Sequence, residues 1–523
     1  MATSAAMPLL RGVGAANDTL SLDNRRTPEL IIGLVGPVGS GVTYTANVIS
    51  DILKSDFDYK PFMWKASALI REACPLVAQT YNEELKGRER IERLQTLGNE
   101  LRKKFGPKYL SEKVVEKIAA VRLAEGYKNK DDPTVPLPLR FVHIVDSLKN
   151  PAEVRLLRDV YGDMFWLVGV FAPKEVREDR LAETGISKSD LPSLMERDED
   201  EGFDAGQKVR DTIYEADFFV RNDAPNDERL RRALRRFFDI LFNLGVDTPT
   251  LDEAAMYTAV SSAASSACLS RQVGAAIYST DGELIGVGAN DVPKYDGGLY
   301  RTEDGERDNR CFKWGGKICH NDQRKETLYQ HIVRELFDAK LLDKKISYDK
   351  AREALARTDI RNLIEYSRAV HAEMEAIISV ARGNKAGIKG STLYCTTFPC
   401  HSCARHIVAA GIKRVVYIEP YPKSLATDLH KDSISVREND EGKRVVFLQY
   451  EGVAPKNIVR FFKHGLSRKS QGKVVVRSAK TADPICQPML DGSATLEKIV
   501  VNNLEAIETA ATKAAAAAGT GDE

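Results

Sequence analysis

The sequence predicts a two-domain α/β protein, because short apolar runs typical of buried strands alternate with longer helical patterns. In the first half of the chain these runs lie at 29–36, 141–146, 165–172 and 217–222, with charged helical patterns between them. Such alternation indicates a parallel sheet covered by helices on both faces. A second α/β pattern follows residues 244–253, which contain Gly, Pro and helix-capping residues typical of a domain boundary.

We expect four segments along the chain. These are a loose tail at 1–27, a first domain at 28–246, a second domain at 247–466 and a partly flexible, Ala-rich extension at 467–523. The second domain is predicted to contain a helix at 251–269, strands at 274–279, 284–289, 392–396 and 414–418, and a helix that begins near Cys400. An insertion at about 292–366 interrupts it and shows little strand character.

The composition excludes several classes of protein. A net charge of +1 over 523 residues does not suit a protein that coats nucleic acid, and 43% hydrophobic residues exclude wholesale disorder. Eight cysteines are too sparse for a disulfide scaffold. There is no apolar run of the roughly 20 residues that a membrane span needs, and the start does not resemble a secretory signal. We therefore expect a soluble cytoplasmic protein without a membrane partner.

The most specific motif places His371 and Glu373 before Cys400 and Cys403, in the order H-x-E…P-C-x-x-C of the zinc deaminases. Two cysteines three residues apart on one helical turn point their sulfurs to the same side. Pro399 suits the start of that helix, whose positive end favours thiolates. With His371, the cysteines make three protein ligands for Zn²⁺ and leave the fourth position for water, as catalytic zinc sites do.

This arrangement predicts separate chemical roles for the metal and for Glu373. Zinc lowers the pKa of a bound water to about 7, and a carboxylate that is not a ligand moves the protons. The alternative is a closed structural zinc site with His401, His406 or Cys395 as fourth ligand. Zinc ribbons usually show two Cys pairs, whereas one pair is found here, so we favour the catalytic interpretation.

Four stretches resemble the cytidine and deoxycytidylate deaminase superfamily. They are RQVGAAI (271–277), GVGAND (286–291), HAEMEAI (371–377) and TTFPCHSCARHIVAAGIKRVVY (396–417). The resemblance implies a three-layer α/β/α domain, substrate binding by Asn290 and Ala372, and a homo-oligomer.

A further string, YIEPYPKSLATDLHKDSI (417–434), resembles the bacterial anti-phage deoxycytidine triphosphate deaminases. Those proteins join a P-loop kinase-like parallel sheet to such a deaminase. The resemblance implies hydrolytic deamination of dCTP, dCMP or both to deoxyuridine nucleotides and ammonia, with depletion of dCTP as an antiviral defence. Two alternatives stay open, namely a cytidine deaminase acting on RNA or single-stranded DNA, and a kinase-like nucleotide sensor or binding protein. A nucleotide or a phage-derived regulator is an expected partner, and nucleic acid is not favoured.

Residues 36–43 follow a strand and precede a helix, which is the context of a phosphate-binding loop. The residues predicted to hold a nucleotide, together with Mg²⁺, are Gly36, Gly39, Ser40, Gly41, Val42 and Thr43. Because Val42 occupies the lysine position, we expect nucleotide binding rather than efficient phosphoryl transfer. Arg177 and Arg180 lie where nucleotide kinases place a basic lid, although exposed salt bridges would explain them equally well.

The insertion contains a second set of metal-ligating residue types. Cys311, Cys319 and His320 lie close together in the sequence, and some related deaminases carry a structural zinc near this place. Their spacing is loose, and ordinary reduced thiols explain the cysteines as well.

Overall fold

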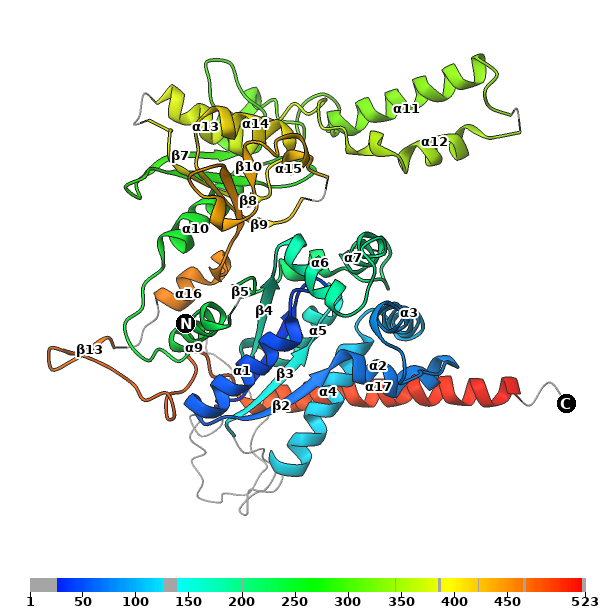
Figure 1. Cartoon of the computed structure of the whole chain (residues 1–523), viewed down its shortest axis with the longest axis vertical. Helices are drawn as coiled ribbons and strands as arrows, with labels where there is room; N and C mark the ends of the chain where they lie inside the picture. The colour runs from blue at the N-terminus through cyan, green and yellow to red at the C-terminus, as the bar shows by residue number, and fades with distance from the viewer. Residues whose placement is uncertain are drawn as a thin grey trace, which may run out of the picture.

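The computed structural model describes residues 26–126, 139–199, 201–224, 226–343, 345–383, 387–421, 423–463 and 467–519. Nearly all of the predicted tail at 1–27 lies outside these residues. Two six-stranded sheets organise the chain, each with helices on both faces, which confirms the predicted α/β class (Figure 1). We call the first sheet and the helices packed on it the first unit, and the second sheet with its helices the second unit.

The first sheet has the strand order β12-β5-β4-β1-β3-β2. Its strands are β1 (Leu30–Val35), β2 (Lys60–Lys65), β3 (Phe141–Asp146), β4 (Phe165–Phe171), β5 (Phe218–Arg221) and β12 (Gly452–Val453). All pairs are parallel except β12 with β5. The helices of this unit are α1 (Val42–Phe57), α2 (Ala66–Ala73), α3 (Gly87–Phe105), α4 (Tyr109–Val121), α5 (Pro151–Tyr161), α6 (Lys174–Glu183), α7 (Leu191–Glu199), α8 (Val209–Ile213) and α9 (Glu228–Leu241).

The fully buried central strand β1 explains why helices cover both faces. Its side chains alternate, so that Ile32 packs in one core with α1 and α9, while Ile31 packs in another with α4, α5 and α8. The turn after β1 leads directly into α1.

The second sheet has the order β10-β11-β9-β8-β6-β7. Its strands are β6 (Gly274–Tyr278), β7 (Leu284–Ala289), β8 (Thr392–Thr397), β9 (Arg414–Glu419), β10 (Ile434–Ser435) and β11 (Val445–Gln449). Strand β6 is antiparallel to both β7 and β8, and the other pairs are parallel. Helices α13 (Ala372–Arg382) and α14 (His401–Ala409) pack on one face, and α10 (Leu251–Ala263) packs on the other, giving the predicted three layers.

The insertion forms a helical hairpin that projects from the second unit (Figure 1). It consists of α11 (His320–Asp338) and α12 (Tyr348–Ala356), in keeping with its predicted lack of strand character. Tyr329 and Val333 are the buried residues of α11. A short helix, α15 (Ala426–Leu429), follows β9 in the main body of the unit.

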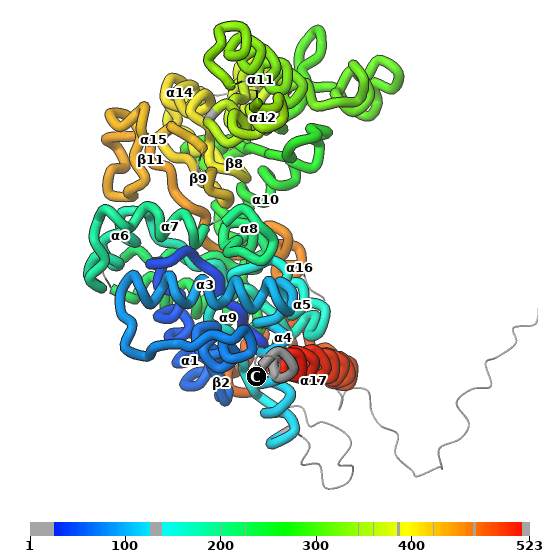
Figure 2. The backbone as a smooth tube through the Cα atoms, turned by 90° about the vertical axis from the view of Figure 1, so that its right-hand side faces the viewer, coloured from blue at the N-terminus to red at the C-terminus, as the bar shows by residue number. Residues whose placement is uncertain are grey.

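After the second sheet the chain returns to the first unit. Strand β12 pairs with β5, α16 (Ile458–Phe462) lies next to α10, and α17 (Leu490–Gly519) packs on α4 and α5 (Figure 2). A buried ion cluster holds α17, because Arg122 contacts Glu497 at 3.0 Å and Glu29 at 2.6 Å. Within the described parts of the chain, no helix is long and apolar enough to cross a membrane.

Candidate active site

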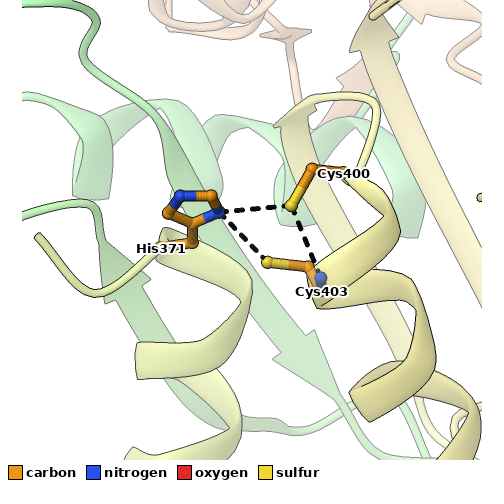
Figure 3. A group of neighbouring side chains, drawn as sticks. All are labelled: His371, Cys400 and Cys403. Atoms are coloured by element: carbon orange, nitrogen blue, oxygen red, sulfur yellow. Dashed lines mark hydrogen bonds between the residues drawn. The ribbon is translucent and has the colours of Figure 1, made fainter. Parts of the chain in front are cut away.

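The structure brings together the three residues that were predicted to hold zinc (Figure 3). The Nδ1 atom of His371 lies 3.4 Å from Sγ of Cys400 and 3.3 Å from Sγ of Cys403. Among the described residues, this is the one group of three or more His, Cys, Asp or Glu whose ligand atoms lie within 4.8 Å of one another. One imidazole and two thiols form a donor set of the kind that zinc prefers, so these residues fit the metal.

Two helix starts position the donors. His371 is the N-cap residue of α13, and Cys400 is the N-cap residue of α14, where its sulfur accepts a hydrogen bond from the backbone N–H of Cys403. Pro399 precedes that cap. The chain reaches this point directly from β8, whose buried side chains fix the direction of the turn.

A glycine in β7 allows α13 to lie close to the sheet. A Cβ atom at Gly288 would stand 2.1 Å from the carbonyl oxygen of Ala372 and 2.4 Å from the backbone nitrogen of Ala376. The backbone of α13 therefore packs directly on β7, and this contact sets the height of His371 and Glu373 above the sheet.

The electrostatics of the group suit a metal and a proton carrier. The pKa of Cys400 is lowered to about 4, first by a hydrogen bond from the thiol of Cys403 and then by His371. Hydrogen bonding with Cys400 raises the pKa of His371 to about 9, so a metal ion must displace a proton from this imidazole. Burial raises the pKa of Glu373 above its ordinary value, which favours uptake of a proton by this carboxyl.

The three alternative fourth ligands do not join this group of donors. Cys395, His401 and His406 are absent from the set of atoms within 4.8 Å of one another, as far as the described residues show. His406 instead uses Nδ1 in a 2.7 Å hydrogen bond with the carbonyl oxygen of Ser402. The arrangement thus favours an open metal site over a closed one.

A cavity of about 450 Å³ is lined by His371 and Cys400 of the donor group and by Glu373. Asn290 and Ala372, the predicted substrate-binding residues, line the same cavity. The amide of Asn290 also shapes the wall, because it accepts a hydrogen bond from the N–H of Val273 and donates one to the carbonyl of Arg271, both at 2.7 Å.

The rest of the cavity wall is basic, a feature that the sequence analysis did not identify. Three carboxylates line the cavity, namely Asp291, Asp322 and Glu373. Six cationic residues line the same cavity, namely Arg210, Arg271, Lys325, Arg361, Arg368 and Lys423. The cations come from segments far apart in the sequence, so no local motif reveals them. The combination of a metal-type donor set, a buried carboxyl and a basic wall suits the hydrolysis of a small anionic substrate.

The candidates for a second metal site lie in this cavity wall without forming a ligand group. Cys311, Cys319 and His320 all line the cavity, but they are not part of any metal-ligand group among the described residues. The Sγ atom of Cys319 lies 3.6 Å from Oγ of Ser270, and the ring of His320 packs against Trp314. The structure therefore adds no support for a second zinc.

The predicted phosphate-binding loop adopts a turn between β1 and α1. Gly39 and Gly41 have φ angles of +84° and +82°, which L side chains rarely adopt. The hydroxyl of Thr43 donates a 2.7 Å hydrogen bond to Asp146 at the end of β3. Val42 packs against the core between α1, α9 and the sheet, in the position where kinases have their lysine.

Side chains of the same chain bind the polar groups of this loop. Asp198 accepts a 2.7 Å hydrogen bond from the N–H of Val38, and Lys149 bridges the carbonyl of Gly36 and Asp198 at 3.1 and 3.0 Å. Arg180, in the predicted basic lid, donates to the carbonyl of Gly39 at 3.3 Å. Arg177 lies over the same glycine and pairs with Glu199 at 2.9 Å. Nucleotide binding at this loop remains a prediction.

Comparison with known proteins defines the family. The family model of the cytidine and deoxycytidylate deaminase zinc-binding region matches residues 249–419. The deoxycytidylate deaminase of Enterobacteria phage T2 is 32% identical over 159 residues, which make up 30% of this chain and 74% of the phage protein. The chain therefore belongs to the cytidine and deoxycytidylate deaminase family.

Two solved structures match parts of the chain at low sequence identity. The apo dCMP deaminase from the cyanophage S-TIM5 is 19% identical, with a TM-score of 0.22, and the match covers 39% of this chain and all of that one (100%). The shikimate kinase from Acinetobacter baumannii, in complex with shikimate, is 12% identical with a TM-score of 0.23 and coverages of 41% and 93%.

Proposed function

We propose that this protein deaminates deoxycytidine nucleotides hydrolytically, yielding deoxyuridine nucleotides and ammonia. The observation that carries the proposal is the buried Glu373, which lines one cavity together with His371 and Cys400 of the donor group that Cys403 completes. Family membership and relatives named deoxycytidylate deaminases support the same chemistry.

Each residue then has a defined task. His371, Cys400 and Cys403 would hold Zn²⁺, which when bound supplies Lewis-acid activation of water. Glu373 takes one proton from the attacking water and delivers it to the ring nitrogen. It then takes the second proton, from the newly added hydroxyl, and delivers it to the amine, which leaves as ammonia while the carbon becomes a carbonyl. Asn290 and Ala372 form the wall against which the nucleoside lies, and the cavity limits access of bulk water.

The basic wall supports a phosphorylated substrate and favours the triphosphate. Six cations against three carboxylates give the cavity an excess positive charge that the whole chain, at +1, does not have. A triphosphate presents more negative charge to this wall than a monophosphate does, so we propose dCTP as the main substrate and dCMP as a lesser one. Depletion of dCTP as an antiviral defence is the role that the resemblance of residues 417–434 supports.

The test is ammonia release from dCMP, dCDP and dCTP by the parent protein and by Glu373→Ala. We expect the variant to keep its zinc but to lose activity by about 10²- to 10⁴-fold, the usual contribution of a general acid–base group. The exposed Glu283, replaced by Ala, is the matched control and should behave like the parent.

Two results would contradict the proposal. One is a Glu373→Ala variant that releases ammonia at the parental rate. The other is a clear preference of the parent for oligonucleotides, with binding that weakens steeply as salt rises, because this behaviour identifies a polynucleotide deaminase.

A further inference from the structure

The cavity that contains the zinc donors is built by both units of the chain. Arg210 belongs to α8 of the first unit, yet it lines the cavity together with His371, Glu373 and Cys400 of the second. The deaminase family model matches residues 249–419, so Arg210 lies outside the segment that this model covers.

The first unit holds the backbone of Arg210 firmly in place. Val209 and Ile213, on either side of it in α8, are 0% and 1% exposed and pack in the core beneath β1. The preceding residue, Lys208, donates a 2.9 Å backbone hydrogen bond to the carbonyl of Lys149. Arg210 is therefore held by the frame of the first unit while it reaches the cavity of the second.

Arg210 joins a group of cations around Lys423. The pKa of Lys423 is lowered, first by burial and then by the positive charges of Arg361, Lys325, Arg210 and Arg271. Among these neighbours, Lys325 lies 2.9 Å from Asp322 and Arg271 pairs with Glu419.

A concentration of like charges in a cavity is stabilised by an anionic ligand that lies among them. The pyrimidine ring of a bound nucleotide must lie near Glu373. The phosphates of the nucleotide then lie at the cationic residues of the cavity wall. Arginine is well suited to such a contact, because its planar guanidinium donates paired hydrogen bonds to phosphate oxygens.

We propose that Arg210 is a specificity-determining residue through which the first unit binds the terminal phosphates of the substrate. The proposal rests on the deamination of deoxycytidine nucleotides argued above. It gives the kinase-like unit a role in substrate selection that does not require a nucleotide at its own phosphate loop.

The test compares steady-state kinetics on dCTP and dCMP for the full chain carrying Arg210→Ala or Arg210→Lys. For Arg210→Ala we expect the KM for dCTP to rise about ten- to a hundredfold, the loss typical of a charge-assisted hydrogen bond, with kcat nearly unchanged. The kinetics on dCMP should stay near the parental values. Arg210→Lys should recover part of the affinity for dCTP, because it restores the charge without the fork geometry.

Arg155→Ala is the matched control, since Arg155 is an exposed arginine on α5 of the same unit. It should change neither substrate's kinetics. Zinc content and thermal unfolding of each variant show whether the fold is intact. If Arg210→Ala lowers kcat/KM equally for dCMP and dCTP, or leaves dCTP unaffected, Arg210 does not select for terminal phosphates and the proposal is overturned.

A binding measurement separates this proposal from the proposed function. Calorimetric titration of dCTP into Glu373→Ala, with and without Arg210→Ala, reports phosphate recognition without turnover. If the parent deaminates no deoxycytidine nucleotide, yet Arg210→Ala still weakens dCTP binding selectively, the catalytic proposal fails and the assignment of Arg210 stands. If dCTP binds equally well with and without Arg210, the assignment fails even where deamination is observed.

Discussion

Two strand–turn–helix junctions of this chain, β8 with α14 and β1 with α1, have different surroundings. The junction of β8 with α14 presents Cys400, one of the two thiols of the donor group, to a cavity of about 450 Å³. The junction of β1 with α1 has its polar groups bound by Asp198 and Lys149. A helix N-terminus favours an anion or a thiolate in both cases, but the neighbouring segments decide whether a ligand has room to bind. Five substitutions probe this difference, in order of decreasing effect.

The largest effect is expected from Cys403→Ala at the first junction. Removal of one of three donors should reduce zinc content to background and lower deamination by more than about a hundredfold, because weaker disturbances around metal ligands already cost tenfold or more. Metal analysis and ammonia release measure both quantities. Cys486→Ala, which removes a thiol far from the donor group in the sequence, should retain zinc and activity. A zinc-loaded, active Cys403→Ala protein would show that the donor group is not the metal site.

Gly288→Ala should have the next largest effect. The added Cβ would meet the backbone of α13 at 2.1 Å and push the helix, with His371 and Glu373, away from the sheet. We expect the free energy of unfolding to fall by about 1–3 kcal/mol, as in other overpacked sites, and deamination to fall with it. Denaturant titration and kinetics provide the measurements.

The corresponding change at the second junction is Gly39→Ala, whose Cβ would meet the carbonyl oxygen of Arg177 at 2.9 Å. It should lower stability while leaving the zinc content unchanged. Equal losses of zinc in both variants would mean that the two junctions are not independent.

Asp198→Ala tests whether the chain's own carboxylate keeps anions from the phosphate loop. The change frees the N–H of Val38, leaves the ammonium of Lys149 without its carboxylate partner, and removes a negative charge. We expect Mg²⁺-ATP to bind about tenfold more tightly than to the parent, which corresponds to the strength of one hydrogen bond to a charged group. Calorimetry gives the affinity, and Asp159→Ala, at an exposed position on α5, is the control. Unchanged affinity would show that the missing lysine, rather than Asp198, limits binding.

The smallest effect is expected from Thr43→Val. This substitution removes the 2.7 Å hydrogen bond to the buried Asp146, and should cost about 0.5–1.5 kcal/mol of unfolding free energy. Deamination should be unchanged, because neither residue lines the cavity. A large loss of activity would indicate that the phosphate loop takes part in the reaction at the zinc site.

The strands that the sequence revealed are those with uninterrupted apolar runs. The predicted strand at 141–146 matches β3, and those at 284–289 and 392–396 match β7 and β8 within one residue. Strand β2 was missed because Lys60, Pro61 and Lys65 break its apolar pattern, and because it lies at a sheet edge where burial is partial. Strand β12 is only two residues long and is defined by its partner rather than by its own composition.

In the candidate site too, residues that form a local sequence pattern were predicted, and residues that meet only in the folded chain were not. His371, Glu373, Cys400 and Cys403 were identified because metal-ligand spacing is local in the sequence. The basic wall was not, since Arg210 and Lys423 meet only through tertiary structure. The binding of Asp198 to the phosphate loop likewise joins residues 160 positions apart. Sequence spacing predicts which atoms can bind a ligand together, but not which distant side chains share or occupy the space around them.

The return of the chain to the first sheet has a consequence for biosynthesis. Since a ribosome releases the chain from its N-terminus, β12 and α17 emerge only after the whole second sheet. Until then β5 is an open sheet edge, and Arg122 and Glu29 lack the partner Glu497. A product interrupted after residue 449 would carry all the zinc donors and yet expose that edge to chaperones and proteases, so quality control can remove incomplete chains that already contain the catalytic residues.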